Sequence, residues 1–321
     1  MAALLACTGL AGCAGELSTL DPAGPAAQSI AQVWWWMLGV STVVMAGVLV
    51  LAAMAFRRRD GVRLSSRGAW RMVLLGGVAL PSTAIIALLI YGLPAGQSMR
   101  LAPPDAFVVE VRAHQWWWEV SYPDASGQPV ISASEIHIPS GRPVTLNITS
   151  GDVIHSFWIP RLGGKIDAIP GRTNALHLTA DAPGEYAGVC AEFCGAQHAR
   201  MRMTVVAHEP DALAQRLAEM GRPHPAHDRL MQHADFVRQC LACHALDPRA
   251  RPTEALQAGP NLAGLAQRAT LGSGLLANTP ENLTVWLRDH QLLKPGNHMP
   301  YTDMTDAQRE ALAALLGERH D

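Results

Sequence analysis

The stretch that decides how this chain is interpreted is Cys190-Ala-Glu-Phe-Cys194-Gly-Ala-Gln-His198-Ala-Arg-Met201. It gathers two thiols, an imidazole and a thioether in one short loop, and a second imidazole, His155, precedes it. Such ligands favour copper, zinc or iron–sulfur chemistry. A blue copper site needs one cysteine, two histidines and a weak axial methionine, so the additional cysteine would allow two thiolates to bridge two copper ions. A Cys2His2 zinc site is the alternative that the spacing leaves open.

Short strand-like runs surround this loop. They alternate in polarity, are rich in β-branched and aromatic residues, and are separated by Gly, Pro, Ser and Asn. Many short strands with punctuated turns are typical of an antiparallel β-sandwich, which we expect over residues 102–208. The runs are Phe107–Val120, Val130–Ile138, Pro143–Ser150 and Arg172–Leu178.

A second chemical motif, Cys240-Leu-Ala-Cys243-His244, lies in the C-terminal part. C-x-x-C-H is the pattern of covalent c-type haem attachment, and its histidine becomes an axial ligand. Gly259-Pro-Asn-Leu262 and Pro295-Gly-Asn-His-Met299-Pro300 follow in the order and approximate spacing of class I cytochromes c. We therefore expect an all-α class I cytochrome c domain over residues 228–321, with a helix over residues 305–316.

Met299 is the expected distal ligand of this haem, and His298 and Met304 are the rival ligands nearby. A His/Met pair raises the reduction potential of a haem. Prolines on either side of His224 favour an extended connection, so we place a linker over residues 209–227. Four histidines are expected to be solvent-exposed and without a metal role: His224, His227, His233 and His290.

Two long apolar runs, Val33–Phe56 and Met72–Met99, lack charged residues. Because about 20 such residues span a bilayer, we predict a transmembrane hairpin within residues 30–100, with helices at about 33–56 and 72–95. The connection is rich in arginine and should remain in the cytoplasm. Both termini and both soluble domains are then expected on the periplasmic side of a bacterial inner membrane. The arginines are Arg57, Arg58, Arg59, Arg63, Arg67 and Arg71, and Trp34, Trp35 and Trp36 suit an interfacial aromatic belt.

The N-terminal residues are small and apolar, although the basic region that usually opens a signal peptide is absent. Leu10-Ala11-Gly12-Cys13 resembles the lipobox of bacterial lipoproteins. We predict a signal peptide over residues 1–12 and lipidation of Cys13.

The composition sets outer bounds on function. A length of 321 residues suggests two domains at roughly 100–200 residues each. The chain is 49% hydrophobic and 16% charged, against about 25% charged in soluble domains, which indicates membrane segments. A net charge of −2 excludes a generally basic nucleic-acid binder. Six cysteines in three close pairs suit cofactor sites better than a disulfide-stapled scaffold.

Residues 30–208 resemble subunit 2 of the haem–copper cytochrome c oxidases. The resemblance rests on the hairpin, on the Cys190–Met201 loop and on three further motifs in the family's order. These motifs are His114-Gln-Trp-Trp-Trp118, Asp152-Val-Ile-His155-Ser and Gly164-Lys-Ile-Asp-Ala-Ile-Pro-Gly-Arg172. The resemblance implies a cupredoxin-like sandwich. With the haem motif added, it implies a caa-type subunit 2, which has a fused cytochrome c domain.

The same resemblance implies a dinuclear copper centre, CuA. Cys190 and Cys194 would bridge the two ions. The Glu192 side chain would reach a magnesium or manganese site shared with subunit 1. Trp116 matches the tryptophan through which electrons reach CuA, and Asp167 and Arg172 fit the interface with subunit 1. The remaining copper ligands would be His155, His198, Met201 and the backbone carbonyl of Glu192.

The resemblance also implies a function. Electrons from an external donor, such as a soluble cytochrome c or a bc complex, would pass through haem c and CuA to haem a of subunit 1. There O2 would be reduced to water with proton translocation, and subunit 3 would be a further partner. Two alternatives are a membrane-anchored copper-delivery protein of thioredoxin type and the electron-donating subunit of a different terminal reductase. Many family members carry a glutamate ahead of the second membrane helix. This chain reads Arg63-Leu-Ser-Ser-Arg67-Gly-Ala-Trp70 there, so no proton-uptake residue is assigned.

Overall fold

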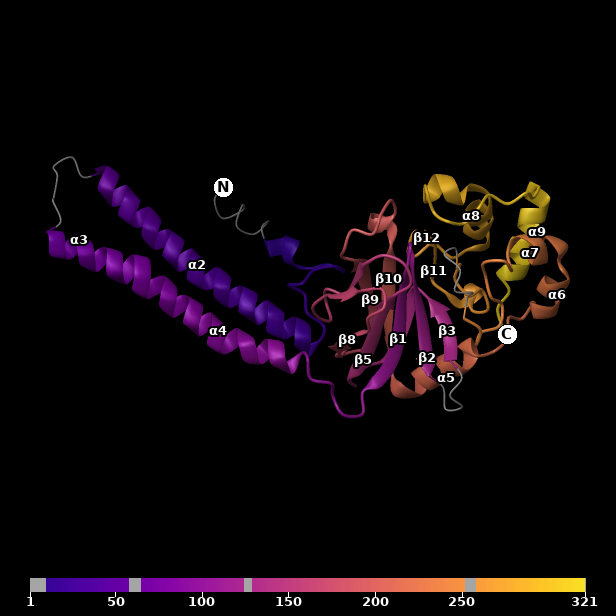
Figure 1. The fold of residues 1–321 in the computed structure, drawn as a ribbon, viewed down its shortest axis with the longest axis horizontal. Helices are drawn as coiled ribbons and strands as arrows, with labels where there is room; N and C mark the ends of the chain where they lie inside the picture. The colour runs from indigo at the N-terminus through magenta and orange to yellow at the C-terminus, as the bar shows by residue number, and fades with distance from the viewer. Residues whose placement is uncertain (1–9, 58–64, 124–128, 252–257, 321) are drawn as a thin grey trace. The chain divides into compact units, whose positions relative to one another are not determined.

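The structure is a computed structural model that describes residues 10–57, 65–123, 129–251 and 258–320. The chain divides into two units (Figure 1). One consists of residues Gln28–Leu101, and the other consists of Met1–Ala27 together with Ala102–Asp321. Each unit is described by itself.

The smaller unit is a helical hairpin. Helix α2 spans Pro25–Arg57, and the second segment runs through α3 (Ser66–Met72), the π-helical stretch η2 (Val73–Ala79) and α4 (Leu80–Ser98). Both segments are long and apolar enough to cross a membrane. The two predicted helices are confirmed, and each extends beyond its predicted bounds.

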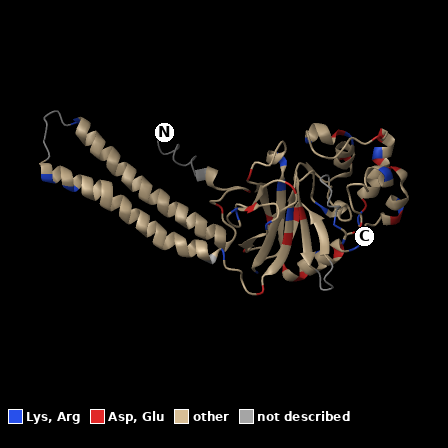
Figure 2. Ribbon diagram, in the orientation of Figure 1, with Lys and Arg blue, Asp and Glu red and all other residues tan. Residues whose placement is uncertain are grey.

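The connecting end of the hairpin carries basic residues (Figure 2). Arg57 ends α2, whereas Arg67 and Arg71 belong to α3. Three further arginines of the predicted basic connection, Arg58, Arg59 and Arg63, lie outside the described residues. The predicted belt residues Trp34, Trp35 and Trp36 are all exposed on α2.

A segment ahead of α2 is bonded to the β-sandwich. The Ala23 amide donates to Arg161 O at 2.7 Å, and the Asp181 amide donates to Ala23 O at 2.9 Å. Asp21 forms an ion pair with Arg161 at 3.2 Å. Gly24 lies so close to Thr179 O that a Cβ atom would overlap it. The chain therefore contacts the sandwich just before the hairpin begins and rejoins it after the hairpin ends.

Two five-stranded sheets form the sandwich, with the orders β3-β2-β1-β5-β8 and β4-β10-β9-β6-β7. Two pairs, β1 with β5 and β4 with β10, are parallel, so both sheets are mixed rather than purely antiparallel. The strands are β1 (Phe107–His114), β2 (Trp117–Pro123), β3 (Pro129–Ala133), β4 (Glu135–Pro139), β5 (Val144–Ser150), β6 (His155–Trp158), β7 (Ile166–Ala168), β8 (Asn174–Leu178), β9 (Gly184–Cys190) and β10 (Arg202–His208).

Two predicted runs each form two strands. Phe107–Val120 turns after His114 into β1 and β2. Val130–Ile138 breaks at Ser134, whose φ of 57° is left-handed and interrupts an extended run. As a result β3 belongs to one sheet and β4 to the other. The apolar faces of the two sheets form one core, which includes Trp118, Tyr122, Phe157, Ile136, Leu146 and Ile148.

The C-terminal part is helical and has its own apolar core, which includes Leu230, Phe236, Leu283 and Leu312. Helix α9 begins at a capping box between Thr305 and Gln308, which confirms the helix expected over residues 305–316. The only strands in its described residues are the short ribbon β11 (Thr270–Leu271) and β12 (Leu276–Ala277). The helices are α6 (His227–Gln232), α7 (Ala234–Gln239), α8 (Pro280–Leu293) and α9 (Asp306–Leu316).

The linker region begins with α5 (Pro210–Met220), which buries Leu213 and Met220. The predicted exposure of four histidines is wrong. His224 and His290 are buried, and His227 and His233 are half-buried. Burial of His224 is possible because both ring nitrogens are satisfied: Nδ1 accepts from the Ala226 amide at 3.1 Å, and Nε2 pairs with Leu316 O at 3.2 Å.

Candidate metal centre and haem site

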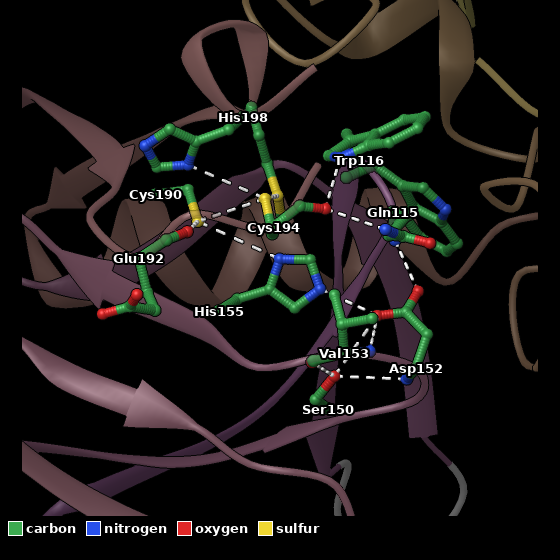
Figure 3. A network of polar contacts seen from close by, with 12 residues as sticks. Gln115, Trp116, Ser150, Asp152, Val153, His155, Cys190, Glu192, Cys194 and His198 are labelled. Carbon is green, nitrogen blue, oxygen red and sulfur yellow. Dashed lines mark hydrogen bonds and ion pairs between the residues drawn. The ribbon is translucent and has the colours of Figure 1, made fainter. Parts of the chain in front are cut away.

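The sulfur and imidazole groups of the predicted metal loop converge at one end of the sandwich (Figure 3). The two Sγ atoms of Cys190 and Cys194 lie 3.8 Å apart as free thiols. His155 Nδ1 lies 3.9 Å from Cys190 Sγ, and His198 Nδ1 lies 3.7 Å from Cys194 Sγ. The Met201 thioether lies 3.9 Å from Cys194 Sγ. Each thiol therefore has one imidazole of its own, which is the symmetry that a dithiolate-bridged metal pair requires.

The sheet topology explains how distant residues meet. Cys190 ends β9 and His155 begins β6, and these strands are neighbours with Phe157 opposite Cys190. His198 lies in the short helical turn η3 (His198–Arg200), and Met201 follows just before β10. The thiols and the thioether are buried, and His155 is fully buried. Burial of so many polarisable donors without carboxylate oxygens favours copper or zinc over calcium or magnesium.

Asp152 holds His155 in place. His155 Nε2 lies 2.8 Å from Asp152 Oδ1, while the Gln115 amide donates to Oδ2 at 2.6 Å and the Val153 amide to Oδ1 at 2.6 Å (Figure 3). Burial acts to raise the pKa of Asp152, but these hydrogen bonds outweigh it and keep the pKa below its ordinary value. An ionised Asp152 requires the proton of His155 on Nε2, which leaves Nδ1 free to bind a metal.

The surroundings shift the pKa values of the two thiols in opposite directions. The hydrogen bond from Cys194 lowers the pKa of Cys190 well below its ordinary value, against the opposing effect of burial. The pKa of Cys194 is raised, because its proton is shared with the Cys190 thiolate and because the thiol is buried. Metal ligands must be deprotonated, so a metal bound by both thiols would release the proton that remains on the pair.

The structure also places the remaining predicted residues of this region. The Glu192 carbonyl lies 3.3 Å from Cys190 Sγ, whereas its side chain is exposed. Trp116 is 7% exposed and its indole N–H donates to Cys194 O at 2.9 Å. Asp167 and Arg172 are exposed. Asp167 lies in β7, and the next residue, Ala168, pairs with His155 of β6.

The haem motif lines a cavity. Cys240, Cys243, His244 and Met299 all contribute to its wall, so the structure brings together the four residues predicted to hold a haem. Part of the wall comes from the sandwich, through Gln115, Trp116, Trp117, Ala133 and Ser134. Trp117 also donates its indole N–H to Ala258 O at 3.3 Å. The cavity therefore lies between the helical domain and the β-sandwich.

Three details of this cavity fit a covalently bound haem. His244 Nδ1 lies 2.7 Å from Pro260 O, which leaves Nε2 available to an iron ion. Gly259 packs against the His244 ring so closely that any Cβ atom would overlap it. Arg268 is buried in the wall, and its Nε atom has no hydrogen-bond partner among the residues that the structure describes. A buried guanidinium with an unsatisfied donor suits an anionic group of a ligand, such as a haem carboxylate.

The segment containing Met299 is fixed by side chains of α8. The Met299 carbonyl lies 3.0 Å from His290 Nε2 and accepts from Gln291 Nε2 at 2.8 Å. Of the two rival ligands, Met304 belongs to the apolar core and is absent from the cavity wall. His298 lines the cavity, but its exposed ring packs on Trp116, with 5.1 Å between the ring centroids.

Several residues of these sites carry no signal of their own in the sequence. Asp152 belongs to a motif but has no predicted role of its own, and His290 is predicted to be exposed. Lys294 was not singled out, although it is 4% exposed and lines the cavity. Burial lowers the pKa of Lys294 to about 7. A lysine next to a distal-ligand motif carries no local signal of burial, because the groups that cover it are distant in the sequence.

Comparisons with known proteins agree with this architecture. The family model described as cytochrome c oxidase subunit II, periplasmic domain, matches residues 128–208, and the cytochrome c model matches residues 234–318. Cytochrome c oxidase subunit 2 of Alkalihalophilus pseudofirmus is 34% identical, with 96% of this chain and 92% of the relative covered. Cytochrome c oxidase subunit 2 of Bacillus sp. (strain PS3) is 33% identical, with 96% and 93% covered.

These matches decide between the alternatives. The mixed β-sandwich, and relatives that match along nearly the whole chain, exclude a copper-delivery protein of thioredoxin type. The same relatives argue against a subunit of a different terminal reductase. The chain belongs to the cytochrome c oxidase subunit 2 family, and it therefore forms part of a haem–copper oxidase, which is an oxidoreductase complex.

Proposed function

We propose that this chain accepts electrons from an external donor and passes them, by way of a haem c and a dinuclear CuA centre, to haem a of subunit 1. The oxidase would use them to reduce O2 to water while translocating protons. The observation that supports this path best is the position of Trp116. Its indole N–H is bonded to Cys194 O, and the same residue lines the haem cavity.

The copper pair would be held by the converging groups of the Cys190–Met201 loop and by His155. Cys190 and Cys194 would bridge the two ions, and His155 and His198 would each bind one of them. Met201 and the Glu192 carbonyl would be weaker ligands. When bound, a dithiolate-bridged copper pair shares one transferred electron over two ions, so bond lengths change little. The protein supports this by holding its ligands in a buried, hydrogen-bonded shell.

The haem would be held by thioether bonds to Cys240 and Cys243, with His244 and Met299 as axial ligands. The Pro260 carbonyl orients His244, and His290 and Gln291 fix the main chain at Met299. This His/Met pair would raise the potential of the haem. Arg268 would pair with a haem carboxylate.

Trp116 would conduct electrons between these two sites. In the structure it is covered by the helical domain, because His298 packs on its ring and Lys294 and Ser273 donate to its carbonyl. An external donor, such as a soluble cytochrome c or a bc complex, would therefore reduce the haem first.

Subunit 1 would dock at the end of the sandwich that contains the metal loop. The exposed carboxylate of Glu192 would reach a magnesium or manganese ion shared between the subunits. Asp167 and Arg172 would contact subunit 1 on the same side, since β7 pairs with β6 next to His155. Subunit 3 would complete the assembly.

The hairpin would cross the bacterial inner membrane twice, with both redox domains and both termini in the periplasm. The bonds of Ala23 to the sandwich support this topology, because they require the start of α2 to lie on the same side as the domain that follows α4. The arginines at the connecting end favour the cytoplasm. Residues 1–12 would be a signal peptide, and Cys13 would carry the lipid.

The path is tested with a haem-free variant, C240S/C243S, in the assembled oxidase. We expect the CuA spectrum to remain and the oxidation of external cytochrome c to fall at least ten-fold. Unchanged oxidation of the donor would show that electrons reach the copper pair without the haem, and would contradict the proposed path.

A further inference from the structure

The helical domain and the sandwich meet at Trp116 through polar contacts. The Trp116 carbonyl accepts from Lys294 Nζ at 2.9 Å and from Ser273 Oγ at 3.1 Å. Lys294 Nζ also donates to Gly272 O at 2.9 Å. A single amino group therefore joins the sandwich to the tip of the β11–β12 ribbon. We call Gly272–Gly274 the ribbon tip.

The ribbon tip is shaped for this contact. Gly272, Ser273 and Gly274 have φ values of 63°, 64° and 81°. This left-handed stretch directs two consecutive carbonyls to groups outside the ribbon, because Gly272 O accepts from Lys294 and Ser273 O accepts from the Arg202 amide at 3.2 Å. A Cβ atom on Gly272 would lie 2.8 Å from the Trp286 ring, so the Trp286 side chain packs directly against the tip.

The residues flanking Lys294 are held by the metal loop. Gln197 donates its side-chain amide to Pro295 O, and Arg200 Nη1 donates to Leu293 O at 2.8 Å. Both donors lie within the loop that contains Cys194 and His198, and both acceptors are next to Lys294. The segment that leads to Met299 is thus fastened directly to the loop that would hold the copper pair.

Domain stability alone does not explain Lys294. Its amino group is buried, and within the described residues no carboxylate lies at ion-pair distance from it. Burying an amino group costs free energy of hydration, and apolar residues often serve stability better. The chain also has 25 Lys and Arg residues, of which two, Lys165 and Lys294, are lysines. The compact amino group of a lysine reaches two carbonyls from different domains here. The guanidinium of an arginine is planar and differs in shape, so arginine is not an equivalent replacement.

We propose that Lys294 is a positioning residue that locks the haem domain onto the sandwich at Trp116, so that electrons cross between the two redox sites within one docked arrangement. This inference rests on the proposed electron path for its purpose. The lock itself concerns only hydrogen bonds within this chain.

Three backbone amides donate hydrogen bonds between the sandwich and the haem domain, at the contact surface that we call the junction. Their exchange reports the opening of this junction. The Ile131 amide donates to Pro248 O at 2.9 Å, the Arg202 amide to Ser273 O at 3.2 Å, and the Ala269 amide to Glu135 Oε2 at 2.9 Å. Their hydrogen exchange follows the equilibrium between docked and undocked forms. Amides in the core of each domain exchange only when that domain unfolds.

The test is hydrogen exchange of the full chain, carrying its haem and copper, for wild type, K294M and S273A. The matched control is R288M, which removes a basic side chain of α8 that is exposed and paired with Asp289. We expect K294M to exchange the three junction amides at least ten-fold faster than wild type, S273A to accelerate them less, and R288M to leave them unchanged. The electron-transfer rate from haem c to CuA should become dependent on solvent viscosity in K294M alone.

Two results would overturn the proposal. One is unchanged exchange at the junction in K294M. The other is equal acceleration throughout the haem domain, which would assign Lys294 to the stability of that domain. Haem and copper contents, measured from the optical spectrum of each sample, test the proposed function separately. A chain without copper would refute the electron path and still report whether Lys294 holds the junction.

Discussion

Replacing Asp152 with Asn removes the charge behind the His155 imidazole while keeping the size of the side chain. In the structure the carboxylate accepts one hydrogen bond from the His155 ring and two from the Gln115 and Val153 amides. An Asn side chain has a single acceptor oxygen. Whichever way the amide lies, its NH2 group faces at least one N–H donor.

The expected size of the effect follows from these contacts. A hydrogen bond to a charged group contributes about 1.5–3 kcal/mol, and about 1.4 kcal/mol corresponds to a factor of ten. Loss of one such bond predicts roughly 10–100-fold weaker copper binding in D152N, which is the range typical of residues behind metal ligands. The covalent haem should be unaffected, since Asp152 is not part of the haem cavity wall.

Copper affinity is measured by competition with a chelator for wild type, D152N and the control D167N. Asp167 is exposed, so its substitution should leave the affinity unchanged. Equal affinities for D152N and wild type would refute the claim that Asp152 holds His155 for metal binding.

Three further predictions concern other parts of the chain. Burial acts to raise the pKa of Glu135, but hydrogen bonds from His137 and the Ala269 amide outweigh this effect and lower the pKa below 4.5. The stabilisation that ionised Glu135 gives to the fold is therefore present above about pH 4.5 and is lost as the pH falls through the lowered pKa. E135Q should lower the free energy of unfolding near neutral pH by about 1–3 kcal/mol and flatten the acid dependence, as read by thermal unfolding; an unaltered pH profile would contradict this. M299H should lower the haem potential in a redox titration, whereas an unchanged potential would place another residue at the distal position. G259A should reduce covalent haem several-fold, because its Cβ atom would overlap the His244 ring, and normal haem content would exclude that overlap.

The predictions that came from local patterns agree best with the structure. The Cys190–Met201 loop is short enough that its donors must lie close together, and its separation from His155 is closed by the pairing of β6 with β9. The apolar runs likewise form the two long helices. Helix α9 follows directly from a capping residue and an apolar pattern.

The predictions that failed depend on contacts between distant segments. His224 and His290 are polar residues in polar sequence surroundings. One ring nitrogen of His224 pairs with Leu316 O, and one ring nitrogen of His290 pairs with Met299 O. Ser134 divides one apparent strand between two sheets, because a left-handed serine leaves no mark on the alternation of polarity. The burial of Lys294 likewise depends on residues distant in the sequence, because its hydrogen-bond partners are Trp116 and the ribbon tip.

The central claim is that Cys190 and Cys194 bridge two copper ions in a chain that also binds one haem covalently. It is tested most directly by copper and haem contents together with an electron paramagnetic resonance spectrum of the purified full chain. The account predicts two coppers per covalent haem and one unpaired electron shared equally by two copper nuclei. Zinc, or a single localised copper, would contradict the bridging roles of Cys190 and Cys194.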